Sequence, residues 1–149
     1  MLFRSVLTHL IAVQDAILVV IDVQDYFLKK IEPAIATRVV ERIRWLVQVA
    51  NWLQVPVIVT AEDSPRRGPT TERIRSVVPS TAPDFNKLVF GLAEQPEILQ
   101  AIAASGRRTA VLVGLETDVC VQHSAFSLAR LGYEVAVVVD ATEIGRAHV

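Results

Sequence analysis

Cysteine is nearly absent from this 149-residue sequence, which holds only Cys120. One cysteine cannot close a disulfide within the chain, which argues against a disulfide-stabilised scaffold and favours a reducing, cytoplasmic setting. Strong charge of one sign is also absent, since the net charge is −1, and we expect neither nucleic acid nor a membrane as a partner. The purely apolar runs are no longer than a strand, well short of the roughly 18–20 residues that a membrane-spanning helix needs.

The sequence does contain enough apolar material for a core. Hydrophobic residues make up 52% of the chain and charged residues 21%, proportions typical of a single globular domain at this length. The two ends look foreign to that domain, because Met1–Ser5 and Glu143–Val149 correspond to opposite readings of one nucleotide string that resembles a sequencing adapter. We therefore expect the domain to occupy residues 6–142.

Four apolar runs have the length and the Val and Ile content of strands, and they are nearly continuous, as in parallel strands covered on both faces: Ala16–Val23, Val55–Ala61, Thr109–Gly114 and Tyr133–Asp140. Helical spacing of apolar residues predicts three helices: Pro33–Leu53, Glu94–Ser105 and Thr117–Leu131. Between them, Glu62–Pro83 is predicted to be a long loop and Lys87–Phe90 a short strand. This alternation predicts a three-layer α/β/α domain with a mostly parallel sheet.

Two residues reach the carboxyl edge of the predicted sheet, where open parallel sheets bind ligands. Asp22 ends the first apolar run, and Cys120 falls in the first turn of the helix after Gly114. From position alone, Asp22 could equally be a carboxylate in a turn, and Cys120 could be a small buried hydrophobic residue. A helix start nonetheless stabilises thiolate, which favours a nucleophile. Since His123 is expected at the surface, an aspartate base with a lysine remains as the activating arrangement.

Three segments resemble, in order and spacing, the signature segments of isochorismatase-like cysteine hydrolases: VVIDVQDYF, FNKLVFG and VLVGLETDVCVQHSAFSLARLGYEVAVVVDAT. The resemblance covers Ala16–Thr142. It implies an Asp–Lys–Cys triad that falls here on Asp22, Lys87 and Cys120. It also implies a covalent mechanism, in which Asp22 takes the thiol proton, Cys120 attacks a carbonyl carbon, and a thioester forms.

The resemblance also implies the geometry around the nucleophile. A cis peptide bond would fall between Leu115 and Glu116, and the backbone N–H groups of Glu116 and Cys120 would form an oxyanion hole. Four further residues are candidates for lining the substrate pocket: Gln24, Phe27, Phe90 and Thr117.

The sequence departs from the nicotinamidases of this family, which bind a metal through an aspartate and two histidines after the second strand. Here that region reads VIVTAEDSPRRGPT and contains no histidine, and Asp63 alone cannot build such a site. We therefore expect no metal and no other cofactor. Arg66 and Arg67 could bind an anionic substrate, although a solvated loop is the default interpretation.

Several functions stay open. The first is hydrolysis of a small amide or related acyl compound through Cys120, the second a catalytically silent module that binds a small molecule or forms oligomers, and the third hydrolysis of a vinyl ether. A dinucleotide-binding domain is disfavoured, because no glycine-rich turn follows the first strand. Relatives continue past Thr142 with a helix and a last strand and often form homo-oligomers. We therefore expect these two elements to be missing here, leaving an exposed sheet edge and a poorly soluble chain.

Overall fold

The computed structural model describes residues 10–144 of the chain. Of the two end segments expected to be foreign, Met1–Ser5 and residues 145–149 lie outside this range, whereas Glu143 closes the last strand. Five parallel strands form one sheet in the order β3-β2-β1-β4-β5. Their bounds are β1 Ala16–Ile21, β2 Val57–Glu62, β3 Asp84–Lys87, β4 Thr109–Leu115 and β5 Glu134–Glu143.

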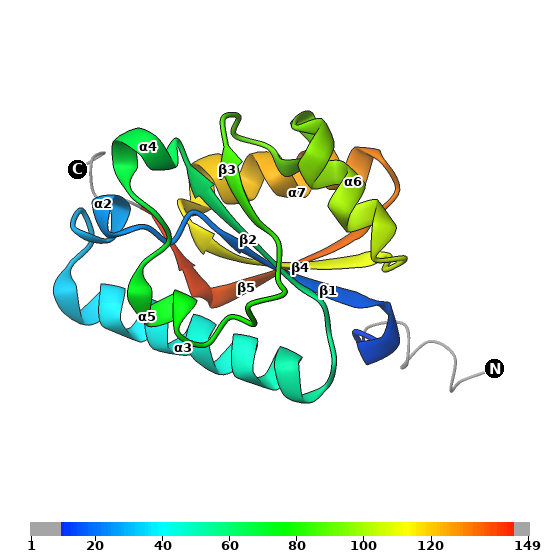
Figure 1. Cartoon of the computed structure of the whole chain (residues 1–149), viewed down its shortest axis with the longest axis horizontal. Helices are drawn as coiled ribbons and strands as arrows, with labels where there is room; N and C mark the ends of the chain where they lie inside the picture. The colour runs from blue at the N-terminus through cyan, green and yellow to red at the C-terminus, as the bar shows by residue number, and fades with distance from the viewer. Residues whose placement is uncertain (1–9, 145–149) are drawn as a thin grey trace.

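Helices cover both faces of the sheet, so the predicted three-layer α/β/α architecture is confirmed (Figure 1). The long helix α3, Pro33–Trp52, lies on one face, and α6, Pro96–Ala104, lies with α7, Gln122–Arg130, on the other. The remaining elements are short turns of helix: η1 Val13–Asp15, α2 Asp25–Leu28, α4 Ser64–Arg67, α5 Glu72–Arg75, η2 Leu92–Glu94 and η3 Thr117–Val121.

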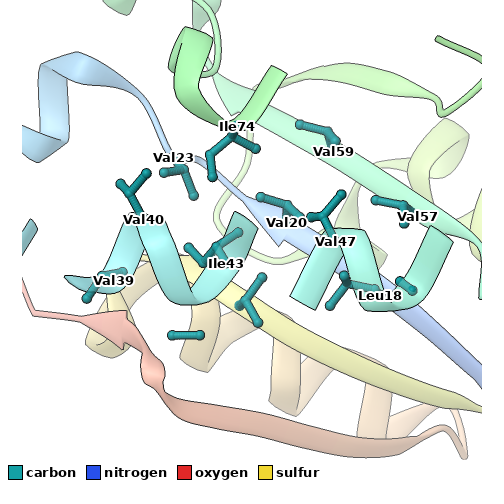
Figure 2. Close-up of a cluster of buried hydrophobic side chains, with 13 residues drawn as sticks. Leu18, Val20, Val23, Val39, Val40, Ile43, Val47, Val57, Val59 and Ile74 are labelled. Atoms are coloured by element: carbon teal, nitrogen blue, oxygen red, sulfur yellow. The ribbon is translucent and has the colours of Figure 1, made fainter. Parts of the chain in front are cut away.

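The central strand β1 explains why the first apolar run is continuous. Successive side chains of a strand point to opposite faces, and here Leu18 and Val20 pack toward α3, whereas Ile17 and Val19 pack toward α6 and α7. Figure 2 shows the first of these two clusters, in which α3 contributes Ile43 and other apolar residues at helical spacing. All six residues of β1 are buried.

The third strand differs from its prediction. It runs over Asp84–Lys87 and ends at the residue where the predicted strand, Lys87–Phe90, begins. As an edge strand paired only with β2, it keeps Asp84 and Asn86 exposed, so no apolar run marks it in the sequence. The predicted loop Glu62–Pro83 is also more ordered than expected, because it carries α4 and α5.

The opposite edge of the sheet is β5, whose outer side pairs with no strand among residues 10–144. Two apolar side chains on it face solvent, with Val139 83% and Val137 38% exposed. Within the same described range, no helix is both long enough and apolar enough to cross a membrane.

Candidate active site

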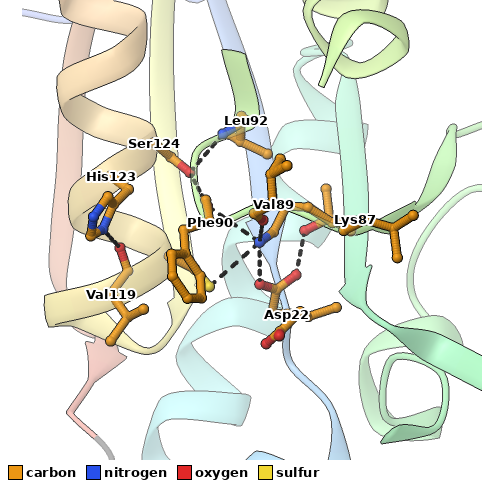
Figure 3. Close-up of polar contacts among 12 residues, drawn as sticks. Asp22, Lys87, Val89, Phe90, Leu92, Val119, His123 and Ser124 are labelled. Carbon is orange, nitrogen blue, oxygen red and sulfur yellow. Dashed lines mark hydrogen bonds and ion pairs between the residues drawn. The ribbon is translucent and has the colours of Figure 1, made fainter. Parts of the chain in front are cut away.

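The carboxyl edge of the sheet brings together the predicted triad: Asp22 after β1, Lys87 at the end of β3 and Cys120 in the turn after β4. Figure 3 shows the Lys87 ammonium beside the Asp22 carboxylate. The ammonium Nζ of Lys87 lies 2.9 Å from carboxylate oxygen Oδ2 of Asp22 and 3.4 Å from Sγ of Cys120. Asp22 and Lys87 are both 0% exposed and Cys120 is 4% exposed. Asp22 and Cys120, 98 positions apart in the chain, therefore lie in one buried cluster around the Lys87 ammonium.

Backbone geometry sets the position of Asp22. Its φ angle is 53°, in the left-handed region that non-glycine residues adopt uncommonly, aspartate more often than most. Its N–H donates to the carbonyl of Thr60 on β2 at 3.0 Å, and Thr60 Oγ1 donates to Oδ1 of Asp22 at 2.8 Å. Oδ2 forms the ion pair with Lys87.

A glycine on β4 allows the strand end that carries Asp22 to form. A Cβ atom on Gly114 would stand 1.9 Å from the carbonyl oxygen of Ile21, and Gly114 has a φ of +123°. No other residue type fits this close approach of two backbones.

Lys87 is anchored at four acceptors. Besides its contacts with Asp22 and Cys120, Nζ donates to the backbone carbonyls of Val89 and Phe90. Burial lowers the pKa of Lys87, but the Asp22 carboxylate and then Cys120 raise it by more, so its pKa lies above its ordinary value. The lysine thus stays an ammonium and acts as a fixed positive charge.

Cys120 occupies a turn of π-helix, Thr117–Val121, that leads into α7. A first-turn position predicts a stabilised thiolate, whereas in the structure the pKa of Cys120 is raised to about 12. Burial is the main cause, the Asp22 carboxylate raises the pKa further, and Lys87 lowers it only in part. The resting group is therefore a thiol beside a carboxylate, and its proton has an acceptor close by.

A short loop after Lys87 is fastened to the helix that follows Cys120. Ser124, one turn along from the thiol and fully buried, accepts from the N–H of Leu92 at 3.2 Å and donates to the carbonyl of Phe90 at 3.5 Å. His123 is exposed, as expected, with Nδ1 2.7 Å from the carbonyl of Val119.

The four residues proposed to line a pocket lie in different settings. Phe27 is 6% exposed and packs with Ile31 and Leu115. Phe90 is 51% exposed, with its ring centroid 5.5 Å from that of His123. Thr117 is the first residue of the π-helical turn.

Gln24 is fully buried and bonds to backbone rather than facing a pocket. Its Nε2 donates to the carbonyls of Glu62 and Gly68 at 2.8 and 2.7 Å, and its Oε1 accepts from the N–H of Glu62 at 2.8 Å. Gln24 therefore clamps the end of β2 and the α4 turn to the end of β1.

Glu62 is the site residue that the sequence prediction missed. One of its carboxylate oxygens lies within 4.8 Å of Sγ of Cys120 and of an oxygen of Asp22. The available signal was its place at the carboxyl end of the second apolar run, which was assigned to the start of the loop instead. These three residues could ligate a metal ion, although the Lys87 ammonium between Asp22 and Cys120 holds a positive charge where a cation would bind.

The peptide bond between Leu115 and Glu116 is cis. The carbonyl of Glu116 accepts from the N–H groups of Val119 and Val121, both at 3.2 Å, which ties the strand end to the π-helical turn. A surface hollow of about 610 Å³ lies elsewhere, between α3 and β5, and no triad residue lines it.

The parallel sheet covered by helices on both faces, with the buried cluster of Asp22, Lys87 and Cys120 at its carboxyl edge, is typical of a hydrolase domain. Comparison with known proteins agrees with this class: the Isochorismatase domain matches residues 16–145. The chain belongs to the isochorismatase family.

Relatives extend beyond the matched region. The secreted isochorismatase effector Isc1 of Phytophthora sojae is 34% identical over 132 residues, which cover 85% of this chain and 61% of that protein. The MAR1 ribonuclease of Caenorhabditis elegans superposes with a TM-score of 0.83 at 28% identity, over 93% of this chain and 69% of that one. The Escherichia coli YcaC protein, described as an octameric hydrolase of unknown specificity, superposes with a TM-score of 0.81 at 24% identity, over 90% and 66% of the two chains. This chain thus spans about three fifths of the length of its Phytophthora relative.

Proposed function

We propose that this chain carries the active site of a cysteine hydrolase that cleaves a small amide or related acyl compound through a thioester. The observation that supports this most is the contact of one buried ammonium with both a carboxylate and a thiol, at 2.9 and 3.4 Å. Burying three titratable groups costs folding free energy, which points to a function that apolar residues could not perform. A base beside a nucleophile, with a charge that stabilises the product of proton transfer, is such a purpose.

In the acylation step, Asp22 removes the proton from Sγ of Cys120 as the sulfur attacks the carbonyl carbon. The carbonyl π electrons move to oxygen and form a tetrahedral oxyanion. When the oxyanion collapses, the C–N bond breaks, and the proton held by Asp22 passes to the departing amine. Lys87 offsets part of the rise in the thiol pKa, and because Asp22 takes the proton as the C–S bond forms, no free thiolate has to accumulate before attack.

In the deacylation step, Asp22 is again a carboxylate and takes a proton from water. The hydroxide equivalent adds to the thioester carbon, the C–S bond breaks, and the proton returns to sulfur. We assign the oxyanion contacts in both steps to the backbone N–H groups of Glu116 and Cys120, because Glu116 directly precedes the π-helical turn and Cys120 lies in it. The same donors would serve both tetrahedral intermediates.

The name of the nematode relative raises RNA cleavage as an alternative. A phosphodiester carries a full negative charge wherever it binds, and next to Cys120 the two carboxylates of Asp22 and Glu62 stand against the single ammonium of Lys87, which leaves a net negative charge that would repel it. A neutral acyl compound meets no such repulsion. The charge around the sulfur therefore favours acyl transfer over phosphodiester cleavage.

The test combines turnover with trapping of the intermediate. The 149-residue chain is incubated with primary carboxamides, N-carbamoyl amino acids and aryl esters, with single-stranded RNA as a further substrate, and acid-quenched samples are analysed by mass spectrometry. We expect an acyl adduct on the peptide that contains Cys120, and loss of adduct and turnover in Cys120→Ala and Asp22→Asn. Asp25→Asn, an exposed carboxylate three residues away, is the matched control and should retain both.

Two outcomes would contradict the proposal. The first is turnover that survives in Cys120→Ala, and the second is RNA cleavage with no acyl adduct from any compound. Cytoplasmic localisation stays a prediction, since the Phytophthora relative is named as secreted. Self-association also stays a prediction, in line with the E. coli protein described as octameric.

A further inference from the structure

Glu62 is held at the active site by its backbone. It ends β2 in register with Lys87 on β3, and Gln24 fixes both its N–H and its carbonyl. The Gln24 side chain is fully buried and makes three hydrogen bonds to backbone, so it has little freedom to move. The backbone of Glu62, from which its side chain projects, is therefore held in a fixed position.

The Glu62 side chain approaches the reacting atoms from the more open side of the cluster. Its carboxylate lies within 4.8 Å of both Sγ of Cys120 and a carboxylate oxygen of Asp22, and its side chain is 17% exposed. Asp22, Lys87 and Cys120 are more deeply buried. Among these four side chains, Glu62 is thus the one most accessible to a compound that arrives from solvent.

The contacts that Glu62 makes leave it able to accept further hydrogen bonds. Its described side-chain partner is Arg67, whose Nη1 stands 3.5 Å from Oε2, at the outer limit of a hydrogen bond. The guanidinium carbon also lies within cation–π distance of two aromatic rings, 5.1 Å from the centroid of Tyr26 and 5.5 Å from that of Phe27. These contacts favour the observed position of Arg67, while Glu62 keeps lone pairs for another donor.

Acceptors outnumber donors next to the sulfur. Oδ2 of Asp22 is buried against the Lys87 ammonium, and Lys87 is also shared with Cys120 and two carbonyls, so the carboxylates of Asp22 and Glu62 keep lone pairs that this ammonium cannot fill. A bound group that brings N–H donors would satisfy these oxygens. A group that brings only oxygen acceptors, or a carboxylate, would leave them unsatisfied or repel them.

We propose that Glu62 is a specificity-determining residue that accepts a hydrogen bond from an N–H on the carbonyl group presented to Cys120. It thereby selects carboxamides and ureido compounds over esters and over carboxylates. This inference rests on the proposed function only in placing a carbonyl compound beside Sγ, and it names the substrate class that the function leaves open.

The test uses matched electrophiles that need no turnover. In acrylamide and methyl acrylate, the sulfur adds to the terminal alkene carbon and the proton passes to the carbon next to the carbonyl. Acrylamide carries an NH2 group on its carbonyl where methyl acrylate carries an OCH3 group, so only acrylamide can donate an N–H hydrogen bond. Second-order rates of Cys120 alkylation are measured by mass spectrometry at fixed pH, and each is divided by the rate for glutathione to remove intrinsic reactivity.

We expect the normalised preference for acrylamide over methyl acrylate to be about tenfold in the wild-type chain, the value of one hydrogen bond to a charged acceptor. Glu62→Ala should abolish that preference, and Glu62→Gln, which keeps an acceptor oxygen but loses the charge, should retain part of it. The control Glu72→Ala removes a surface carboxylate on α5 that is 74% exposed and should leave the preference unchanged.

A wild-type preference equal to that of glutathione would overturn the inference, as would a preference that survives in Glu62→Ala. Failure of both reagents to alkylate Cys120 over a day would also overturn it, because no carboxamide would then reach the sulfur. Loss of the proposed function looks different, since the preference would persist while no acyl adduct forms from any amide. Thermal unfolding of each variant shows whether a lost preference reflects loss of the fold.

Discussion

The ammonium of Lys87 lies 2.9 Å from the Asp22 carboxylate, and neither side chain is exposed to solvent. Taking two charges out of water costs several kcal/mol for each ion, and their mutual attraction offsets this cost only while both are present. The pair therefore connects stability to the proposed chemistry: the same ammonium that neutralises Asp22 in the folded chain also faces Sγ of Cys120.

Removing the ammonium should destabilise the fold. Lys87→Ala leaves the Asp22 carboxylate buried and unpaired, which typically costs about 3–5 kcal/mol. Denaturant titration should show this loss in the free energy of unfolding, whereas Lys29→Ala, which removes an exposed lysine on the surface, should change it by less than about 0.5 kcal/mol. Equal stability of the two variants would mean that the buried pair is not formed.

The raised pKa of Cys120 predicts a loss of stability in alkaline solution. An unfolded thiol loses its proton near pH 9, whereas the folded one keeps it until about pH 12. The folded chain therefore binds one more proton in this window, and the free energy of unfolding should fall as pH rises, by at most about 1.4 kcal/mol per pH unit. Denaturant titrations between pH 8 and 10.5 should show this slope, and Cys120→Ala should reduce it. A slope that Cys120→Ala leaves unchanged would contradict the buried thiol.

Gly114 should tolerate no side chain. The Cβ of Gly114→Ala would meet the Ile21 carbonyl oxygen at 1.9 Å, which forces β1 and β4 apart next to Asp22. We expect a cost of more than about 3 kcal/mol. Gly106→Ala is the matched control, because Gly106 also has a positive φ, +70°, but has open space around it, so its cost should stay near 1 kcal/mol. Unfolding free energies of the two variants compare the effects directly, and similar values would mean that the strands do not approach so closely.

The exposed edge of β5 should make the 149-residue chain prone to association. Unpaired apolar edge strands template pairing with other chains, and a charged residue suppresses it. Val139→Lys should therefore increase the fraction of expressed chain that stays in solution after centrifugation. Leu131→Lys, at an exposed apolar residue just after α7, is the matched control and should have a smaller effect. A cooperative, soluble wild-type monomer at high concentration would contradict the prediction.

The sequence predicted the architecture because buried parallel strands leave a strong signal. The run AILVVI in β1 is covered on both faces, so its composition alone identifies it. The edge strand β3 has the composition DFNK and leaves no such signal. Its position followed only from pairing with β2, which the sequence does not show.

The site was predictable in part and for different reasons. Asp22 and Cys120 could be placed at the sheet edge by counting along the chain, whereas Lys87 was found through the family resemblance alone. Glu62 was missed because the boundary of β2 was drawn one residue too early. The direction of the Cys120 pKa was also wrong, because helix position can be read from sequence but burial beside a distant carboxylate cannot.

The most direct test of this site is the pH dependence of Cys120 alkylation in three chains. In the wild type, the rate with iodoacetamide should keep rising beyond pH 10, as expected for a pKa raised to about 12. Asp22→Asn should move the profile to lower pH, because that carboxylate raises the thiol pKa, and Lys87→Ala should move it to higher pH. A wild-type profile that levels off below pH 9 and does not move in either variant would contradict the account, because the thiol would then be titrating independently of both neighbours.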